Sequence, residues 1–356
     1  MNYHKFRKGA RNYCMGNITI KDIAKIAGVS YSTVSRALSG APGISSATRE
    51  RIIKICDEKG YRANALARSL INKKTNVLGL IVPEVTNPFY SELSLEIETY
   101  ARKLGYNIML CNSLNDHART EELFNFLLSH RVDGILHASS RIYSADMLKN
   151  YSSSIPFILI GTAPAECNSI LNTISTDNYE GGRIAAKYLL SLGHRDIFYM
   201  GYREGSTSHQ LRLLGFNSVM EEAGLKPVIL ENPSNGSSIA KGYELCRPVF
   251  SKPFRQTAMF AATDSMALGA MKAAGEYHIS IPGDLSLLSY DNTIFSSLPR
   301  ISLSTVDQRK QLLARAAVDL MMQLLGHPFN DQNMHQLIRP SLVIRNSCRE
   351  LTSEGG

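Results

Sequence analysis

The 356-residue sequence has no apolar run that approaches the roughly 18 residues or more of a membrane-spanning helix. Its basic start is not followed by an apolar stretch, so it lacks the pattern of a secretory signal. The six cysteines are scattered, with no CxxC pair and no zinc spacing of Cys and His. These absences predict a cytoplasmic protein with free thiols, no metal, no cofactor and no membrane partner.

The common motifs of enzyme active sites are also missing. There is no GxSxG, no HExxH, no Walker-type loop and no GxGxxG after an expected strand. The nine histidines show no paired metal spacing, and His194 in LGHRD is expected to be structural. We therefore expect a binding protein rather than an enzyme.

Positive charge is concentrated at the start of the chain. Residues 1–76 hold 15 Lys and Arg against 4 Asp and Glu, a net charge of +11, and the other 280 residues hold 24 against 27, a net charge of −3. A basic head on a mildly acidic body indicates that the head binds a polyanion, although a solvated basic tail has the same composition. The chain length predicts two or three compact units.

Residues 19–40, TIKDIAKIAGVSYSTVSRALSG, have the pattern of two short helices around a tight turn. Thr19 and Ser30 are suited to cap the helices, and Gly28 permits a left-handed turn between them. The apolar positions at helical spacing are Ile20, Ile23, Ala24, Ala27, Val34, Ala37 and Leu38. A third helix is expected from Ser45 to Gly60, packed through Ile52, Ile53 and Cys56.

The second helix carries hydroxyls and one guanidinium where a core helix would carry aliphatic bulk. This predicts a recognition helix in the DNA major groove, with Arg36 reading a guanine, whereas the alternative is a helical hairpin with an incidental polar face. The expected DNA contacts in this head are Thr19, Ile20, Ser30, Tyr31, Ser32, Thr33, Ser35, Arg36, Ser45 and Thr48.

Several segments, in order, resemble the lactose/galactose-repressor (LacI/GalR) family of bacterial transcriptional regulators. They are TIKDIAKIAGVSYSTVSRALSG, YRANALARSL, VLGLIVPEVTNPFYSEL, VDGIL, DNYEGG, LGHRDIFYMG, AATDSMALGA, LSLLSYDNT and LSTVDQ. The resemblance extends over residues 17–345 and implies a helix-turn-helix DNA-binding domain at 19–60, followed by a hinge helix and linker at 61–75.

The resemblance also implies that two hinge helices of a dimer enter the DNA minor groove. Tyr61, Asn64, Ala67 and Leu70 match the contacts, with Leu70 as a wedge between base steps. Ala63 stands where many relatives have Pro, which predicts slightly weaker DNA binding. Residues 1–18 form a longer extension than usual, expected to be a disordered arm that contacts phosphates, and Met15 is an alternative start.

From Asn76 onwards, short apolar runs alternate with helical patterns. The runs are VLGLIV, YNIMLCN, VDGILHA, PFILIG, DIFYMG, TAMFAAT, DLSLLSY and ISLST, and the expected helices are 88–104, 118–130, 179–193, 208–224, 239–250, 264–277 and 307–325. This alternation predicts an α/β fold with parallel sheets covered by helices. The resemblance implies a two-lobed, type I periplasmic-binding-protein-like core, with lobe 1 at about 76–175 and 306–337 and lobe 2 at about 176–305 and 338–356.

Ligands of such folds bind at the carboxyl ends of the strands, here in the cleft between the lobes. The candidate effector-binding residues are Asn87, Phe89, Ser139, Ser140, Gln210, Thr263, Ser265, Asp291 and Gln308. A carboxylate, amides and hydroxyls beside an aromatic ring suit a sugar, with Asp291 accepting hydrogen bonds from hydroxyls and Phe89 covering an apolar ring face. The alternatives are that Asp291 caps a loop and that Phe89 packs within its lobe.

Three residues depart from the family pattern in this cleft. Gln210 stands where many relatives have Arg, Thr263 where sugar-responsive members have Asn, and Lys310 near a position that is often aromatic. The first change removes a forked cation. These departures predict either a pocket remodelled for an unusual ligand or a vestigial cleft, as in members that are controlled by a phosphorylated carrier protein.

Together these observations predict a sequence-specific transcriptional repressor whose operator affinity is controlled by a small-molecule effector. A secreted binding protein would share the body, but it would need an export signal and would not need a basic head. No leucine heptad follows residue 345, so a homodimer is expected. A two-fold dimer implies a near-palindromic operator on double-stranded DNA.

Overall fold

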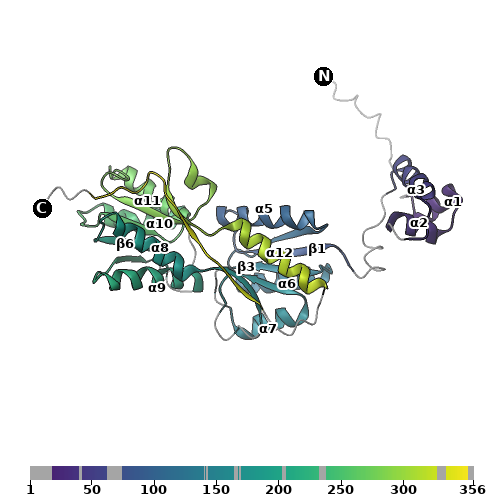
Figure 1. The fold of residues 1–356 in the computed structure, drawn as a ribbon, viewed down its shortest axis with the longest axis horizontal. Coiled ribbons are helices and arrows are strands. Elements are labelled where there is room, and N and C mark those ends of the chain that lie inside the picture. The colour runs from purple at the N-terminus through teal and green to yellow at the C-terminus, as the bar shows by residue number, and fades with distance from the viewer. Residues whose placement is uncertain are drawn as a thin grey trace, which may run out of the picture. The chain divides into compact units, whose positions relative to one another are not determined.

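The structure is a computed structural model, and it describes residues 18–39, 42–61, 74–139, 141, 143–163, 167, 170–202, 206–231, 238–326 and 334–351. The chain divides into two compact units, Met1–Thr75 and Asn76–Gly356 (Figure 1). Within the described ranges, no helix is long and apolar enough to cross a membrane.

The described part of the first unit contains three helices, α1 (Ile20–Ala27), α2 (Tyr31–Ser39) and α3 (Ser46–Lys59). Thr19 and Asp22 form a capping box at α1, and Gly28 ends this helix with a φ of 61°, as predicted. Ile52 and Cys56 of α3 are buried in the small core. The prediction for Ile53 is wrong, because its side chain is 43% exposed on the outer face of α3.

Within its described residues, the second unit contains two six-stranded sheets, each with its own helices (Figure 1). The first sheet, in spatial order, consists of β11 (His335–Ile338), β5 (Asn172–Thr176), β4 (Phe157–Ile160), β3 (Gly134–Ala138), β1 (Val77–Val82) and β2 (Asn107–Asn112), all parallel. One face packs on α5 (Pro88–Lys103) and α12 (Lys310–Gly326), and the other on α6 (His117–Ser129) and α7 (Ala145–Ser154). We call this sheet with its helices lobe 1.

The second sheet, in spatial order, consists of β12 (Ser341–Val343), β10 (Ser304–Asp307), β9 (Ser286–Asp291), β8 (Ala258–Ala261), β6 (Ile197–Gly201) and β7 (Val228–Glu231). One face packs on α8 (Asn178–Ser191) and α9 (Thr207–Glu222), and the other on α10 (Ile239–Phe250) and α11 (Asp264–Glu276). A short 3₁₀ helix, η2 (Ile294–Ser297), follows β9. We call this sheet with its helices lobe 2.

The fold is α/β as predicted, with one difference in strand direction. β12 pairs antiparallel with β10, because the chain returns from lobe 1 directly from β11 into an edge strand without an intervening helix. The chain passes between the lobes three times, after β5, after β10 and after β11. His194 is structural, since its ring nitrogens lie 2.9 Å from Thr257 Oγ1 and 3.1 Å from the Arg349 carbonyl.

Candidate functional site

The outer face of α2 presents the side chains that the sequence predicts for DNA contact. Tyr31 is 48% exposed, Ser32 and Arg36 are also exposed, and Thr33 and Ser35 are half-buried. Ser30 precedes the helix, and its Oγ accepts a hydrogen bond from Thr33 N at 3.1 Å. A phosphate or base edge that approaches this face therefore meets hydroxyls and a guanidinium.

The remaining predicted DNA contacts lie around this helix or outside the described residues. Thr19 and Ser45 are exposed, whereas Ile20, Thr48 and Tyr61 are half-buried. Ser45 Oγ accepts from Thr48 N at 3.2 Å and caps α3. The structure describes none of Asn64, Ala67 and Leu70, nor residues 1–17, so these predictions stay untested.

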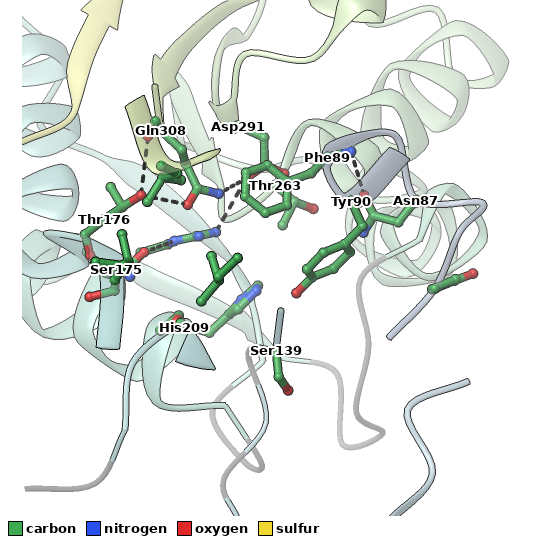
Figure 2. A pocket seen from close by; sticks show the side chains of 18 of the residues that line it. Asn87, Phe89, Tyr90, Ser139, Ser175, Thr176, His209, Thr263, Asp291 and Gln308 are labelled. Atoms are coloured by element: carbon green, nitrogen blue, oxygen red, sulfur yellow. Dashed lines mark hydrogen bonds and ion pairs between the residues drawn. The ribbon is translucent and has the colours of Figure 1, made fainter. Parts of the chain in front are cut away.

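The second unit has a pocket at the carboxyl ends of strands from both lobes (Figure 2). From lobe 1 it is lined by Glu84, Asn87, Phe89, Tyr90, Asn115, Ser139, Ile160, Gly161, Ile174, Ser175, Thr176 and Leu313. From lobe 2 and the chain crossings it is lined by Asn178, Tyr202, Ser208, His209, Arg212, Thr263, Asp291 and Gln308. A ligand in this pocket contacts both lobes at once.

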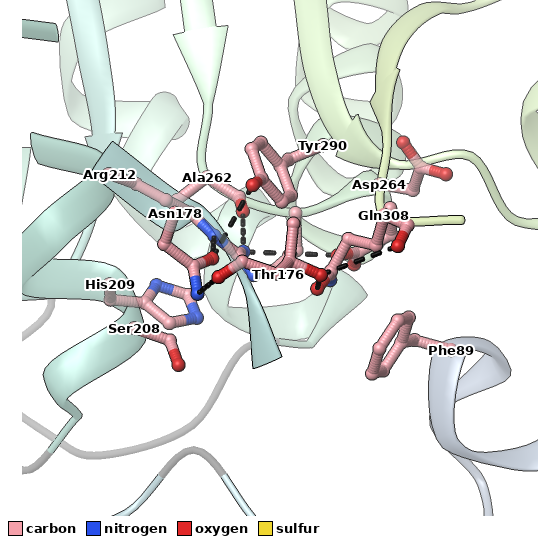
Figure 3. A network of polar contacts seen from close by, with 12 residues as sticks. Phe89, Thr176, Asn178, Ser208, His209, Arg212, Ala262, Asp264, Tyr290 and Gln308 are labelled. Carbon is pink, nitrogen blue, oxygen red and sulfur yellow. Dashed lines mark hydrogen bonds and ion pairs between the residues drawn. The ribbon is translucent and has the colours of Figure 1, made fainter. Parts of the chain in front are cut away.

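Arg212 on α9 is the only guanidinium among the lining residues described, and it is rigidly held. Its Nε donates to Asn178 Oδ1 at 2.8 Å and its Nη1 to the Ala262 carbonyl at 2.7 Å (Figure 3). The guanidinium carbon lies 3.7 Å from the centre of the Tyr290 ring. Nη1 is also 3.8 Å from Asp291 Oδ1, so a buried cation faces a buried carboxylate.

Asp291 is the last residue of β9, and only 3% of the residue is exposed to solvent. Gln308 Nε2 donates to Asp291 Oδ1 at 2.6 Å. Burial raises the pKa of Asp291 to about 7, against the opposing effect of Arg212. Asp291 has a φ of 116° and Asn292 a φ of 51°, so two successive residues other than glycine adopt strained backbone at the pocket.

Two polar residues connect Asp291 to the places where the chain changes lobes. Thr176 ends β5, and its Oγ1 donates to Gln308 Oε1 at 3.0 Å. Gln308 follows β10 and in turn donates to Asp291. Two of the three crossings are therefore hydrogen-bonded to each other and to the pocket carboxylate.

Aromatic rings form part of the pocket wall in both lobes. The His209 ring stacks on Tyr202 with 3.9 Å between centroids, and Phe89 meets Tyr90 edge-to-face at 5.1 Å. Burial, and secondarily Arg212, lowers the pKa of His209 well below its usual range, so its ring is neutral at physiological pH. These flat faces suit the apolar side of a ring-shaped ligand.

The pocket includes six of the nine residues that the sequence predicts: Asn87, Phe89, Ser139, Thr263, Asp291 and Gln308. Asn87 and Thr263 also cap α5 and α11, by accepting from Phe89 N and Met266 N. Gln210 and Ser265 are not among the lining residues, and Ser140 lies outside the described residues.

The expectation that the pocket lacks a forked cation is wrong. Arg212 supplies it from the same helix, two residues after Gln210, and a two-residue step turns a side chain to the opposite side of a helix. The buried face of α9 contains His209, Arg212, Leu213, Phe216 and Met220. Polar and apolar residues are distributed almost evenly around α9, so the sequence pattern alone does not mark Arg212 as buried.

The fold and the pocket define a two-lobed ligand-binding body that is joined to a helix-turn-helix DNA-binding head. Residues 186–348 match the periplasmic binding protein-like domain family, and residues 19–64 match the family described as bacterial regulatory proteins, lacI family. Catabolite control protein A of Priestia megaterium is 32% identical over 326 residues, which cover 90% of this chain and 96% of that protein.

Two solved structures extend this comparison. The lac repressor dimer bound to operator and the anti-inducer ONPF has a TM-score of 0.82 and 27% identity, covering 93% of this chain and 99% of that one. A regulator from Enterococcus faecalis with bound ribose has a TM-score of 0.68 and 30% identity, covering 78% and 100%. The chain belongs to the lacI family of bacterial regulatory proteins, and it is a DNA-binding transcriptional regulator.

Proposed function

We propose that this regulator is a cytoplasmic, homodimeric repressor with no catalytic role. Its head contacts a near-palindromic operator through the residues predicted above, with Arg36 reading a base edge and the hydroxyls of α2 lying near phosphates. The exposure of Tyr31, Ser32 and Arg36 on one helix supports this assignment. The hinge segment 61–75 adds the minor-groove contacts that the family resemblance implies.

We further propose that the pocket binds a sugar or a sugar derivative. The observation that carries this proposal is the pairing of Arg212 with Asp291, a fixed donor and a fixed acceptor that face one space. Vicinal hydroxyls both donate and accept, so they satisfy the two groups together. The neutral rings of Phe89 and His209 suit the apolar face of a sugar ring, and a structurally similar regulator holds ribose.

Control through a phosphorylated carrier protein alone would leave the pocket without a ligand. Against this alternative, Arg212 and Asp291 are both buried, and each is hydrogen-bonded to a side chain of the protein, Asn178 and Gln308 respectively. Burying a cation beside a carboxyl group is costly, so a cleft with no ligand would be expected to replace them with apolar residues. The small-molecule reading is therefore the one we propose.

The test uses the full-length protein and a labelled operator selected from random-sequence DNA. Operator affinity is measured by fluorescence anisotropy with and without D-ribose and a panel of other sugars and sugar phosphates. We expect one class of sugar to change operator affinity, and Asp291→Asn to abolish that response while leaving operator affinity without sugar unchanged.

Gln210→Ala is the matched control, because Gln210 lies on the same helix as Arg212 but does not line the pocket. This variant is expected to respond normally. A normal response from Asp291→Asn would refute the assignment of the pocket. If no sugar changes the operator affinity of the wild-type protein and a phosphorylated carrier protein does, control by the carrier protein would be favoured.

A further inference from the structure

Lys310 lies beside the pocket rather than in its lining. It is the first residue of α12 in lobe 1, and its side chain is 11% exposed. Its Nζ donates to the carbonyls of Asp291 at 2.8 Å and Asn292 at 2.7 Å, and lies 3.3 Å from Glu92 Oε2. Three acceptors thus match the three donors of the ammonium group.

Glu92 on α5, also in lobe 1, makes the second half of this contact. Its other oxygen, Oε1, accepts a hydrogen bond from Ile294 N at 2.8 Å. Asp291, Asn292 and Ile294 belong to the turn between β9 and η2 of lobe 2. Two side chains of lobe 1 therefore hold three backbone groups of one turn in lobe 2.

The same turn is fixed independently from within lobe 2. The buried carboxylate of Asp264 accepts from Thr293 N at 2.7 Å, and Arg345 Nη2 donates to Asn292 Oδ1 at 2.7 Å. Because lobe 2 already holds the turn in shape, the contacts from Lys310 and Glu92 act mainly between the lobes.

We propose that Lys310 and Glu92 form an interlobe latch. The latch holds the turn that carries Asp291 against lobe 1, and so it sets how readily the pocket opens. Lys310 is a positioning residue in this arrangement, since it acts through the backbone of Asp291 and does not line the pocket. The inference goes beyond the proposed function, and its test needs no effector.

Two adjacent backbone amides distinguish loosening of the interlobe latch from loosening of the turn itself. Ile294 N is bonded across the lobes to Glu92, whereas Thr293 N is bonded within lobe 2 to Asp264. Amide hydrogen exchange of both is measured by NMR in the full-length protein. Lys310→Met should accelerate exchange at Ile294 by about tenfold, because it removes charge-assisted hydrogen bonds that limit local opening.

Exchange at Thr293 should stay unchanged in Lys310→Met, and Lys310→Arg should restore protection at Ile294. If Lys310→Met fails to fold, Glu92→Gln removes the charge but keeps an acceptor, and a smaller acceleration of about threefold at Ile294 is expected. The control is Glu222→Gln, which removes an ion pair within lobe 2, Arg183 Nη1–Glu222 Oε1 at 2.8 Å, and should affect neither amide.

Each other outcome overturns the latch. Unchanged exchange at Ile294 would mean that Lys310 does not hold the lobes together. Equal acceleration at Thr293 and Ile294 would mean that Lys310 stabilises the turn within lobe 2. The sugar response of operator binding is measured separately. If the wild-type protein responds to sugar while either of these exchange results is found, the latch is refuted and the proposed function is not.

Discussion

The buried carboxylate of Asp291 should make the stability of this regulator fall as pH rises. In the unfolded chain its pKa returns to an ordinary value near 3.8, whereas burial raises it to about 7 in the folded protein. The folded state therefore binds the proton more tightly. Between these two values the free energy of unfolding decreases with increasing pH, and the contribution of Asp291 is largest below the lower pKa.

The shift from 3.8 to about 7 corresponds to at most about 4 kcal/mol over the whole interval. Within the interval, the slope for one group is about 1.4 kcal/mol per pH unit. Asp291→Asn keeps the size of the side chain and its acceptor for Gln308, but it never ionises. The variant should therefore gain stability relative to the wild type as pH rises from 5 to about 7, with a constant difference above that range.

Urea unfolding of both full-length proteins, followed by circular dichroism at several pH values from 5 to 8, measures this difference. The comparison of the two proteins removes the titration of groups that do not interact with Asp291, whereas the buried Asp264, whose charge also raises the pKa of Asp291, contributes to the difference. Parallel stability curves for the wild type and Asp291→Asn would refute the reasoning, because they would mean that Asp291 ionises as an exposed carboxylate does.

Three further substitutions test the head and the pocket. Arg36→Ala should cost about 1–3 kcal/mol of operator binding and relax preference at one base pair per half-site, whereas uniform weakening across sequences would indicate a phosphate contact. Thr19→Ala removes the capping box of α1 and should lower the stability of the head by about 1 kcal/mol in thermal unfolding; an unchanged head would show that the cap is not needed. Arg212→Met leaves Asn178 and Asp291 without their cation and should lower the urea midpoint by the equivalent of roughly 3–5 kcal/mol, and a loss below about 1 kcal/mol would contradict a buried pair.

Local signals in the sequence predict most of the helices. The predicted helix 239–250 has the observed bounds, and 88–104 differs from α5 by one residue. The predicted helix 307–325 begins too early, because Asp307 ends β10 and Arg309 adopts a φ of 56°. Residues 307–311, DQRKQ, are all polar, so no apolar spacing in this stretch reveals where the helix begins.

The short and polar elements were not predicted. β5 has the sequence NTIST, β11 has HQLI and β12 has SLV, none of which is a long apolar run. They become strands because a neighbouring strand offers unpaired backbone groups, which is a tertiary effect. The helix α7, ADMLKNYSSS, was not predicted either. It buries only Leu148 and Tyr151, so its sequence is mostly polar and shows no apolar face.

The pocket residues divide in the same way. Asn87, Ser139, Thr263 and Asp291 follow or end strands, and that position in a parallel sheet indicates a ligand site without any knowledge of tertiary contacts. Thr176 and Asn178 enter the pocket at a chain crossing and His209 enters it from α9, because the two lobes meet there. A single sequence does not show which crossing or which helix faces the cleft. Arg212 is missed for the same reason, since α9 has no clear division into apolar and polar faces.

Asp291 brings together the elements that a two-state regulator needs. Gln308 joins it to two chain crossings, Lys310 joins its backbone to lobe 1, and Arg212 faces it from α9. A ligand bound to Asp291 and to Phe89 contacts both lobes, so its affinity depends on how far the lobes are apart. A ligand shifts an equilibrium only through such differential affinity. Operator binding and effector binding are thermodynamically linked through the separation of the lobes. The factor by which bound operator changes effector affinity therefore equals the factor by which bound effector changes operator affinity.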